Sequence, residues 1–152
     1  MSTHYQGTAR ERRALDAFIK LQRAASTVGA RLYAPLAREH GLTESQLGVL
    51  EAILHLGPLS QGQLCEKLLR SGSNLTTVVD NLERAGLVRR ERAAEDRRVQ
   101  IVDLTATGRE LIGRVFPRHV QNVAELMAAL TGEEQEQLAR LCRKLGLATR
   151  RT

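Results

Sequence analysis

The spacing of apolar residues changes near the middle of this chain, and that change restricts the fold more than any other feature. Before residue 87, apolar side chains recur every three or four positions, as on one face of a helix. Two short stretches then read as strands, residues 87–92 and 99–104, joined by the charged loop 93–98. The helical spacing resumes after Thr105. The sequence therefore predicts a small β-hairpin between helices.

Two short helices are predicted directly before this hairpin, at residues 61–68 and 73–85. Ser60 and Gln63 have the spacing of a capping box at the start of the first one, and a small polar turn separates the two helices. Two helices joined by a short turn and followed by a hairpin form a winged helix-turn-helix, whose second helix enters the major groove of DNA.

Longer helices are predicted on either side of this unit. One covers residues 9–40, and two more follow Thr105 up to residue 147, with a break near Thr131. Their apolar faces exceed what a chain of this size buries alone, which favours a dimer. The predicted fold class is mainly α with a small β-hairpin wing. We expect a single domain over residues 1–152, in which residues 43–104 form the DNA-binding unit and residues 9–40 and 106–147 form dimerisation helices.

The charge balance agrees with a nucleic-acid partner. The formal net charge is +6 and the isoelectric point is about 10.1, which favours a polyanion. Aromatic residues make up only 3% of the chain and tryptophan is missing. This composition argues against single-strand binding, which uses aromatic side chains as stacking platforms. Duplex DNA is the expected partner.

The outer face of the helix at 73–85 carries short hydrogen-bonding side chains that can read base edges, and the hairpin carries arginines that can enter a minor groove. We therefore predict DNA contacts from both elements and from the turn before the helix. The predicted DNA-binding residues are Arg70, Ser71, Ser73, Asn74, Thr76, Thr77, Asn81, Arg84, Arg89, Arg90, Asp96, Arg97 and Arg98.

Three segments carry a family resemblance: the run from Asn81 to Arg90, the triplet Asp96-Arg97-Arg98, and the stretch from Leu104 to Gly108. Together they resemble the MarR family (multiple antibiotic resistance regulators), and the resemblance extends along the chain. In the family wing an Asp orients an Arg that reaches the minor groove. That role would fall here to Asp96 and Arg98.

The resemblance implies a homodimer that binds an inverted-repeat operator, acts as a repressor and is released by a small aromatic or phenolic effector. Effectors of the family bind in a cleft between the dimer helices and the DNA-binding unit. Candidates for lining such a cleft here are Tyr33, His40, His55, Phe116 and His119. No cofactor is expected.

Several alternatives remain open at this point. A thiol-based redox regulator of the same fold would use Cys65 or Cys142, although both are expected to be buried and inert. A protein-interaction module would keep the fold and lose DNA binding. The chain has no P-loop, no nucleophile-elbow motif and no Cys or His spacing typical of a metal site, so we expect neither an enzyme nor a metalloprotein. No signal peptide or membrane span is evident, and the expected location is cytoplasmic.

Overall fold

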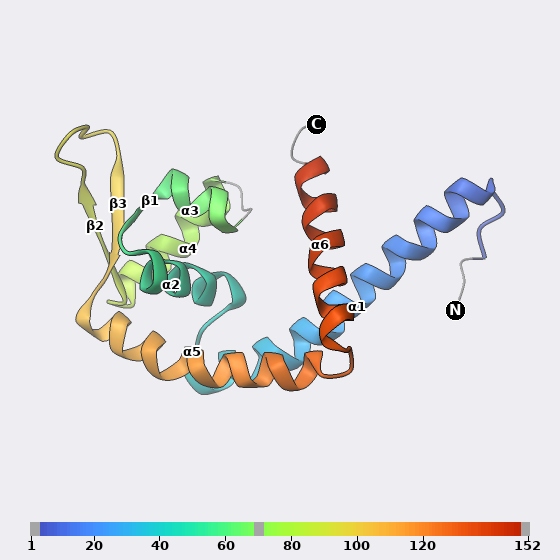
Figure 1. Ribbon diagram of the computed structural model, residues 1–152. Coiled ribbons are helices and arrows are strands. Elements are labelled where there is room, and N and C mark those ends of the chain that lie inside the picture. Colours follow the sequence, from blue (N-terminus) through green and yellow to red (C-terminus); the bar gives the residue numbers. More distant parts are fainter. Residues whose placement is uncertain (1–3, 69–71, 150–152) are drawn as a thin grey trace. The chain divides into compact units, whose positions relative to one another are not determined.

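The computed structural model describes residues 4–68 and 72–149 (Figure 1). The chain forms two compact units, Met1–Phe116 and Pro117–Thr152. In chain order the elements are α1 Ala9–His40, α2 Glu44–Leu56, β1 Leu59–Ser60, α3 Gln61–Leu68, α4 Gly72–Arg84, β2 Val88–Arg92, β3 Gln100–Leu104, α5 Ala106–Met127 and α6 Gly132–Thr149. The last turns of α5 and the whole of α6 belong to the second unit.

The centre of the first unit is a winged helix-turn-helix. Helices α2, α3 and α4 contact one another, and α4 also contacts β2. The strands form an antiparallel sheet in the order β1-β3-β2, in which Arg90 lies opposite Val102 and Leu59 opposite the same residue on the other side. In Figure 1 the β2–β3 hairpin extends beyond the helices as the wing. The predicted fold class is thus confirmed.

A single apolar core holds these elements together. Side chains at helical spacing on α2, α3 and α4 meet the inward face of the sheet. Each fully buried aliphatic side chain contributes about 1.5–3 kcal/mol to folding relative to an exposed one. The largest of them, all less than 2% exposed, are Leu50, Ile53, Leu64, Leu75, Leu82, Ile112, Val49, Val79, Val88 and Val102.

The recognition helix α4 ends at a glycine that sets the direction of the wing. Gly86 has φ 73°, a left-handed conformation that side chains rarely adopt. Its N–H donates to Glu83 O at 2.9 Å, and the N–H of Leu87 donates to Leu82 O at 2.9 Å. This pair of bonds is the Schellman motif, which ends a helix and turns the chain. Strand β2 begins two residues later.

Capping boxes open several helices, among them the predicted one at Ser60 and Gln63. Thr43 caps α2 together with Gln46, and Ser60 exchanges hydrogen bonds with Gln63 at the start of α3. Thr131 and Glu134 do the same before α6. A further box that was not predicted, Thr8 with Glu11, opens α1.

Most predicted element bounds agree with the structure to within one or two residues, but one strand was not predicted and the expected burial of the two cysteines was wrong. Strand β1 was not predicted, because two residues after Pro58 are too few to show an alternating pattern. Cys142 is exposed, and Cys65 is only partly buried, so neither thiol is deeply buried within the chain. Across the described residues, none of the helices combines the length and the apolar character that a membrane span needs.

Candidate nucleic-acid interface

The polar side chains of α4 fall on two neighbouring faces of the helix. Thr76, Asp80 and Glu83 are spaced by four and three residues and form one stripe. Asn74, Thr77, Asn81 and Arg84, spaced by three, four and three, form the other. The remaining face of α4 is apolar and is buried in the core. The structure thus divides residues that the sequence analysis treated as one polar surface.

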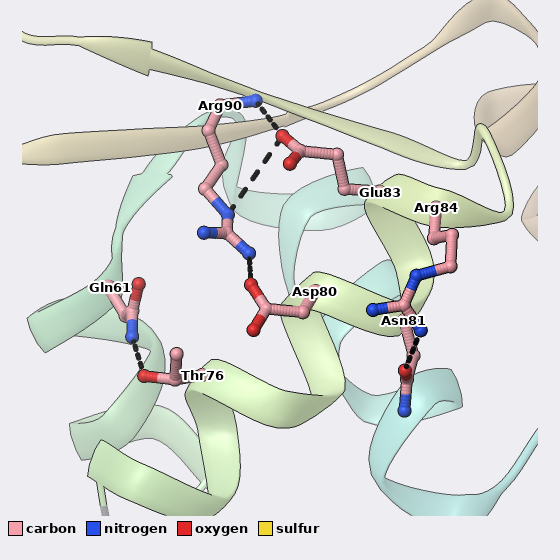
Figure 2. A network of polar contacts seen from close by, with 7 residues as sticks. All are labelled: Gln61, Thr76, Asp80, Asn81, Glu83, Arg84 and Arg90. Atoms are coloured by element: carbon pink, nitrogen blue, oxygen red, sulfur yellow. Dashed lines mark hydrogen bonds and ion pairs between the residues drawn. The ribbon is translucent and has the colours of Figure 1, made fainter.

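The side chains of the first stripe form hydrogen bonds with α3 and β2 (Figure 2). Gln61 Nε2 at the start of α3 donates a hydrogen bond to Thr76 Oγ1. The guanidinium group of Arg90 on β2 donates to Asp80 Oδ1, and the backbone N–H of Arg90 donates to Glu83 Oε2 at 3.2 Å. Thr76, a predicted DNA contact, is therefore partly buried and bonded to α3.

The second stripe is exposed to solvent along its length. Arg84 donates from one terminal nitrogen to Asn81 Oδ1 at 3.1 Å, which aligns the two side chains near the end of the helix (Figure 2). An asparagine amide can pair with adenine through two hydrogen bonds, and a threonine methyl can touch thymine. This stripe has the chemistry of direct base reading.

Three predicted contacts cannot be placed in the same way. Arg70 and Ser71 lie outside the described residues. Ser73 lies within α4, in its first turn.

The tip of the wing is organised around Asp96. Its carboxylate oxygen Oδ1 accepts from the backbone N–H of Arg98 at 3.0 Å and from Arg98 Nε at 3.3 Å. The carbonyl of Asp96 accepts from Val99 N at 3.0 Å, which closes the turn before β3. Even with this contact the Arg98 side chain is 93% exposed. Asp96 therefore orients a cation that remains available to a phosphate or a narrow groove, and Arg97 beside it is exposed as well.

Two neighbouring arginines of β2 face opposite sides of the sheet, because side chains alternate along a strand. Arg89 lies directly opposite Asp103 and contacts its Oδ2 at 3.2 Å, and it also lies 3.4 Å from Glu91. Arg90 points to the side of Val88 and of α4, where its side chain is only 17% exposed. Both arginines contact carboxylates of the same chain, but Arg89 is 57% exposed and stays accessible to a ligand, whereas Arg90 is largely covered.

Thr105 joins the end of the wing to the start of α5 through two hydrogen bonds. Thr105 Oγ1 donates to the carbonyl of Gly86 at 2.6 Å and accepts from Gly108 N at 3.0 Å. The threonine therefore caps α5 and holds it to the turn after α4 at the same time. This geometry explains the Leu104–Gly108 segment that the sequence analysis singled out by resemblance.

One proposed effector residue lies in a hollow of the first unit. Tyr33 lines an open space of about 610 Å³. Apart from Glu44 at the start of α2, its lining comes from one stretch of α1: Ala25, Ser26, Val28, Gly29, Ala30, Leu32 and Tyr33.

Two other candidates meet elsewhere in the first unit. The rings of His55 and Phe116 pack edge to face with centroids 5.2 Å apart, and His55 Nδ1 lies 3.0 Å from Glu51 O. His40 is exposed beside Glu39. His119 belongs to the second unit, where burial lowers its pKa. Among the candidates of the first unit, His55 and Phe116 are in direct contact.

Four residues that hold the interface in place were not predicted from the sequence. Gln61, Asp80, Glu83 and Asp103 all bind predicted contact residues. Strand alternation carried a usable signal, since it puts Arg90 on the same face as the apolar Val88. The Asp80–Glu83 spacing similarly puts both carboxylates on one side of α4.

Comparison with known proteins identifies the family. The MarR family model matches residues 40–99. The HTH-type transcriptional regulator MhqR of Bacillus subtilis is 31% identical over 135 residues, which cover 89% of this chain and 92% of that protein.

Solved structures agree with this match. The MarR family transcriptional regulator Sco3205 of Streptomyces coelicolor, in complex with DNA, has a TM-score of 0.80 at 29% identity, covering 94% of this chain and 89% of that one. A MepR-like protein complexed with pseudoligands has a TM-score of 0.69 at 28% identity, covering 86% and 94%. The chain therefore belongs to the MarR family of DNA-binding transcriptional regulators.

Proposed function

We propose that this regulator is a homodimeric repressor that binds an inverted-repeat operator in duplex DNA and leaves it when a small aromatic ligand binds. The observation that carries the proposal is the pairing of an exposed base-reading stripe on α4 with an exposed, Asp96-oriented arginine on the wing. The first suits the major groove and the second an adjacent minor groove.

The proposed DNA contacts include the exposed members of the predicted set and also Arg70, Ser71 and Ser73, whose side chains lie outside the described part of the chain. On α4 they are Asn74, Thr77, Asn81 and Arg84, together with Ser73 in its first turn and with Arg70 and Ser71 before it. On the wing they are Arg89, Arg97 and Arg98, with Asp96 as the residue that orients Arg98. Thr76 and Arg90 were predicted contacts too, but their bonds within the chain favour a supporting role.

Unpaired apolar surface supports the dimer. In α1 only Leu32 and Leu36 are buried, whereas Phe18 is 58% exposed. None of the described residues of α6 is buried, and Leu138, Leu141 and Leu145 repeat along one exposed face of it. Apolar faces of this length are stable in water when a partner covers them. A second copy of the chain would do so and would place two winged units for two half-sites.

The effector proposal rests on the hollow beside Tyr33. Its volume of about 610 Å³ is within the range of small-molecule sites, and Val28, Leu32 and Tyr33 give it an apolar and aromatic lining. The MepR-like relative was solved with pseudoligands bound. A ring compound would stack on or against Tyr33 with a polar group toward solvent.

The proposal is tested by selection from a pool of random duplex DNA at about 0.15 M salt, where non-specific phosphate binding is weak. We expect a recovered inverted repeat with half-sites about one helical turn, roughly 10 base pairs, apart. Retention without a common sequence, or a single half-site bound by a monomer, would contradict the proposal.

The recovered duplex then serves as the probe for the effector and for repression. Phenol, benzoate and salicylate are titrated into the complex, and release of DNA by the native chain but not by a Tyr33→Ala variant is expected. Transcription from a promoter that overlaps the recovered site should fall when the protein is added. Activation in the same assay would refute the repressor assignment and leave DNA binding intact.

A further inference from the structure

We infer that Arg90 is a positioning residue for DNA recognition: it ties the wing to the recognition helix through Asp80 and Glu83 and does not itself touch DNA. The inference rests on the proposed sequence-specific binding and adds to it a device that keeps α4 and the wing at a fixed spacing. Two grooves of one duplex are read together only when their readers hold that spacing.

The contacts of Arg90 are directed at one helix. Its side chain leaves β2 on the same face as Val88 and is 17% exposed. A terminal nitrogen donates to Asp80 Oδ1, and Nε lies 4.0 Å from Glu83 Oε2 (Figure 2). A planar guanidinium group can hold two carboxylates in a set geometry, which an ammonium group does less well. The two acids stand one turn apart on α4, so the pair also resists rotation of the helix against the strand.

Glu83 makes a second bond that fixes the strand itself. Its Oε2 accepts from the backbone N–H of Arg90 at 3.2 Å. Strand β2 lies at the edge of the sheet, with β3 as its neighbour on one side only. An edge strand presents backbone N–H groups that need a partner. One carboxylate of α4 therefore accepts a hydrogen bond from the backbone of Arg90 and lies within ion-pair distance of the side chain of the same residue.

The charges of this network decide how it can be tested. Asp80 and Glu83 place two negative charges on the helix proposed to enter the major groove, and one arginine only partly offsets them. Removing a negative charge near DNA ordinarily strengthens binding, because phosphate repulsion falls. If the acids position the wing instead, their removal weakens specific binding. The two roles predict opposite signs for the same substitution.

The experiment measures Kd for the full-length protein on the selected duplex and on a scrambled duplex of equal length, over a range of salt. For Asp80→Asn and for Glu83→Gln we expect specific binding to weaken about tenfold, the size of one lost charge-assisted hydrogen bond. Binding to the scrambled duplex should stay equal or become slightly tighter. Glu91→Gln is the matched control, since Glu91 is exposed on the same strand and contacts Arg89. It should strengthen binding to both duplexes a little.

Arg90 itself is tested by Arg90→Met and by the double variant with Asp80→Asn. We expect Arg90→Met to weaken specific binding about tenfold with an unchanged salt slope, and Asp80→Asn to add little further loss in that background. A direct phosphate contact would instead lower the slope by about one. If the Arg90→Met variant does not fold, Arg90→Lys provides a milder change. Because an ammonium group holds two carboxylates less well than a guanidinium group, the lysine variant should keep only part of the preference for the selected duplex.

The outcomes separate this inference from the proposed function. A native protein that does not distinguish the two duplexes overturns both. A native protein that does distinguish them, with Glu83→Gln strengthening binding as Glu91→Gln does, overturns the inference alone. Equal losses on both duplexes with a reduced salt slope for Arg90→Met also overturn it, because they make Arg90 a DNA contact.

Discussion

The carbonyl of Leu87 occupies the space that a side chain on Gly108 would need. A Cβ atom on Gly108 would lie 1.9 Å from Leu87 O and 2.8 Å from the Leu87 carbonyl carbon. The first turn of α5 can thus approach the backbone between α4 and β2 only at a residue without a side chain. Thr105 bonds across the same junction, so the position of α5 and that of the wing depend on each other.

Gly108→Ala should therefore destabilise the protein by about 2 kcal/mol or more, because the backbone that it meets cannot rotate away as a flexible side chain can. Chemical denaturation checks this value. Gly113→Ala is the control. Gly113 is exposed on the same helix, and an added Cβ there would have nothing within 4 Å apart from the adjacent residues and the backbone of its own helix, so the substitution should be neutral or stabilising by up to about 1 kcal/mol. Equal effects of the two substitutions would contradict this close approach at Gly108.

Thr105→Ala should lower the free energy of unfolding more than the substitution of an ordinary N-cap residue does. Thr105 both caps α5 and donates to Gly86 O, so we expect a loss of about 2 kcal/mol, compared with about 1 kcal/mol for Thr43→Ala at the start of α2. Both values come from urea unfolding of the two variants. A Thr105 variant no less stable than the Thr43 variant would show that the bond to Gly86 contributes nothing.

Asn81→Ala should reduce discrimination between DNA sequences. A base contact is worth about 1–3 kcal/mol, so Kd for the selected duplex should rise at least about fivefold while the scrambled duplex is little affected. Asn122→Ala makes the same chemical change at an exposed position of α5 outside the winged unit. An Asn81 variant that behaves like Asn122→Ala would remove Asn81 from the reading stripe.

The stability of the protein should depend on pH through His119. Burial lowers the pKa of His119 in the folded state below its ordinary value of 6.5. The unfolded state then binds more protons below that pH, so the stabilisation present above pH 6.5 is lost as pH falls through the folded pKa. Unfolding free energies of the native chain and of His119→Gln, measured between about pH 7.5 and 5.5, should diverge toward the acid side. Parallel curves would contradict this assignment.

Local signals explain why so much of the winged unit was predictable. Thr43 and Gly86 mark a helix start and a helix end through chemistry that acts within a few residues, and the strands show their alternation over five residues each. The support of the reading surface depends on pairs distant in sequence, such as Gln61 with Thr76. Sequence spacing alone could not say that Thr76 faces α3 while Thr77, one residue later, lies on the exposed stripe.

The same reasoning applies to the wing. The order of charged residues suggested that Asp96 and Arg98 form a pair. In the structure Arg98 Nε lies 3.3 Å from Asp96 Oδ1. It also separates Arg89 from Arg90, which differ in exposure although they are adjacent and identical. That difference comes from the packing of β2 on α4, which is a tertiary effect.

The central claim, that the winged unit binds operator DNA through its exposed cations, is tested most directly by reversing the charge of Arg98. Kd for the selected duplex is measured for the native protein, for Arg98→Glu and for Arg143→Glu, an equal charge change on the exposed surface of α6. We predict that Arg98→Glu lowers affinity at least about a hundredfold, through lost groove contact and added repulsion, with the dimer retained in size-exclusion chromatography. Arg143→Glu should change affinity far less. Equal affinities for Arg98→Glu and the native protein would contradict the claim.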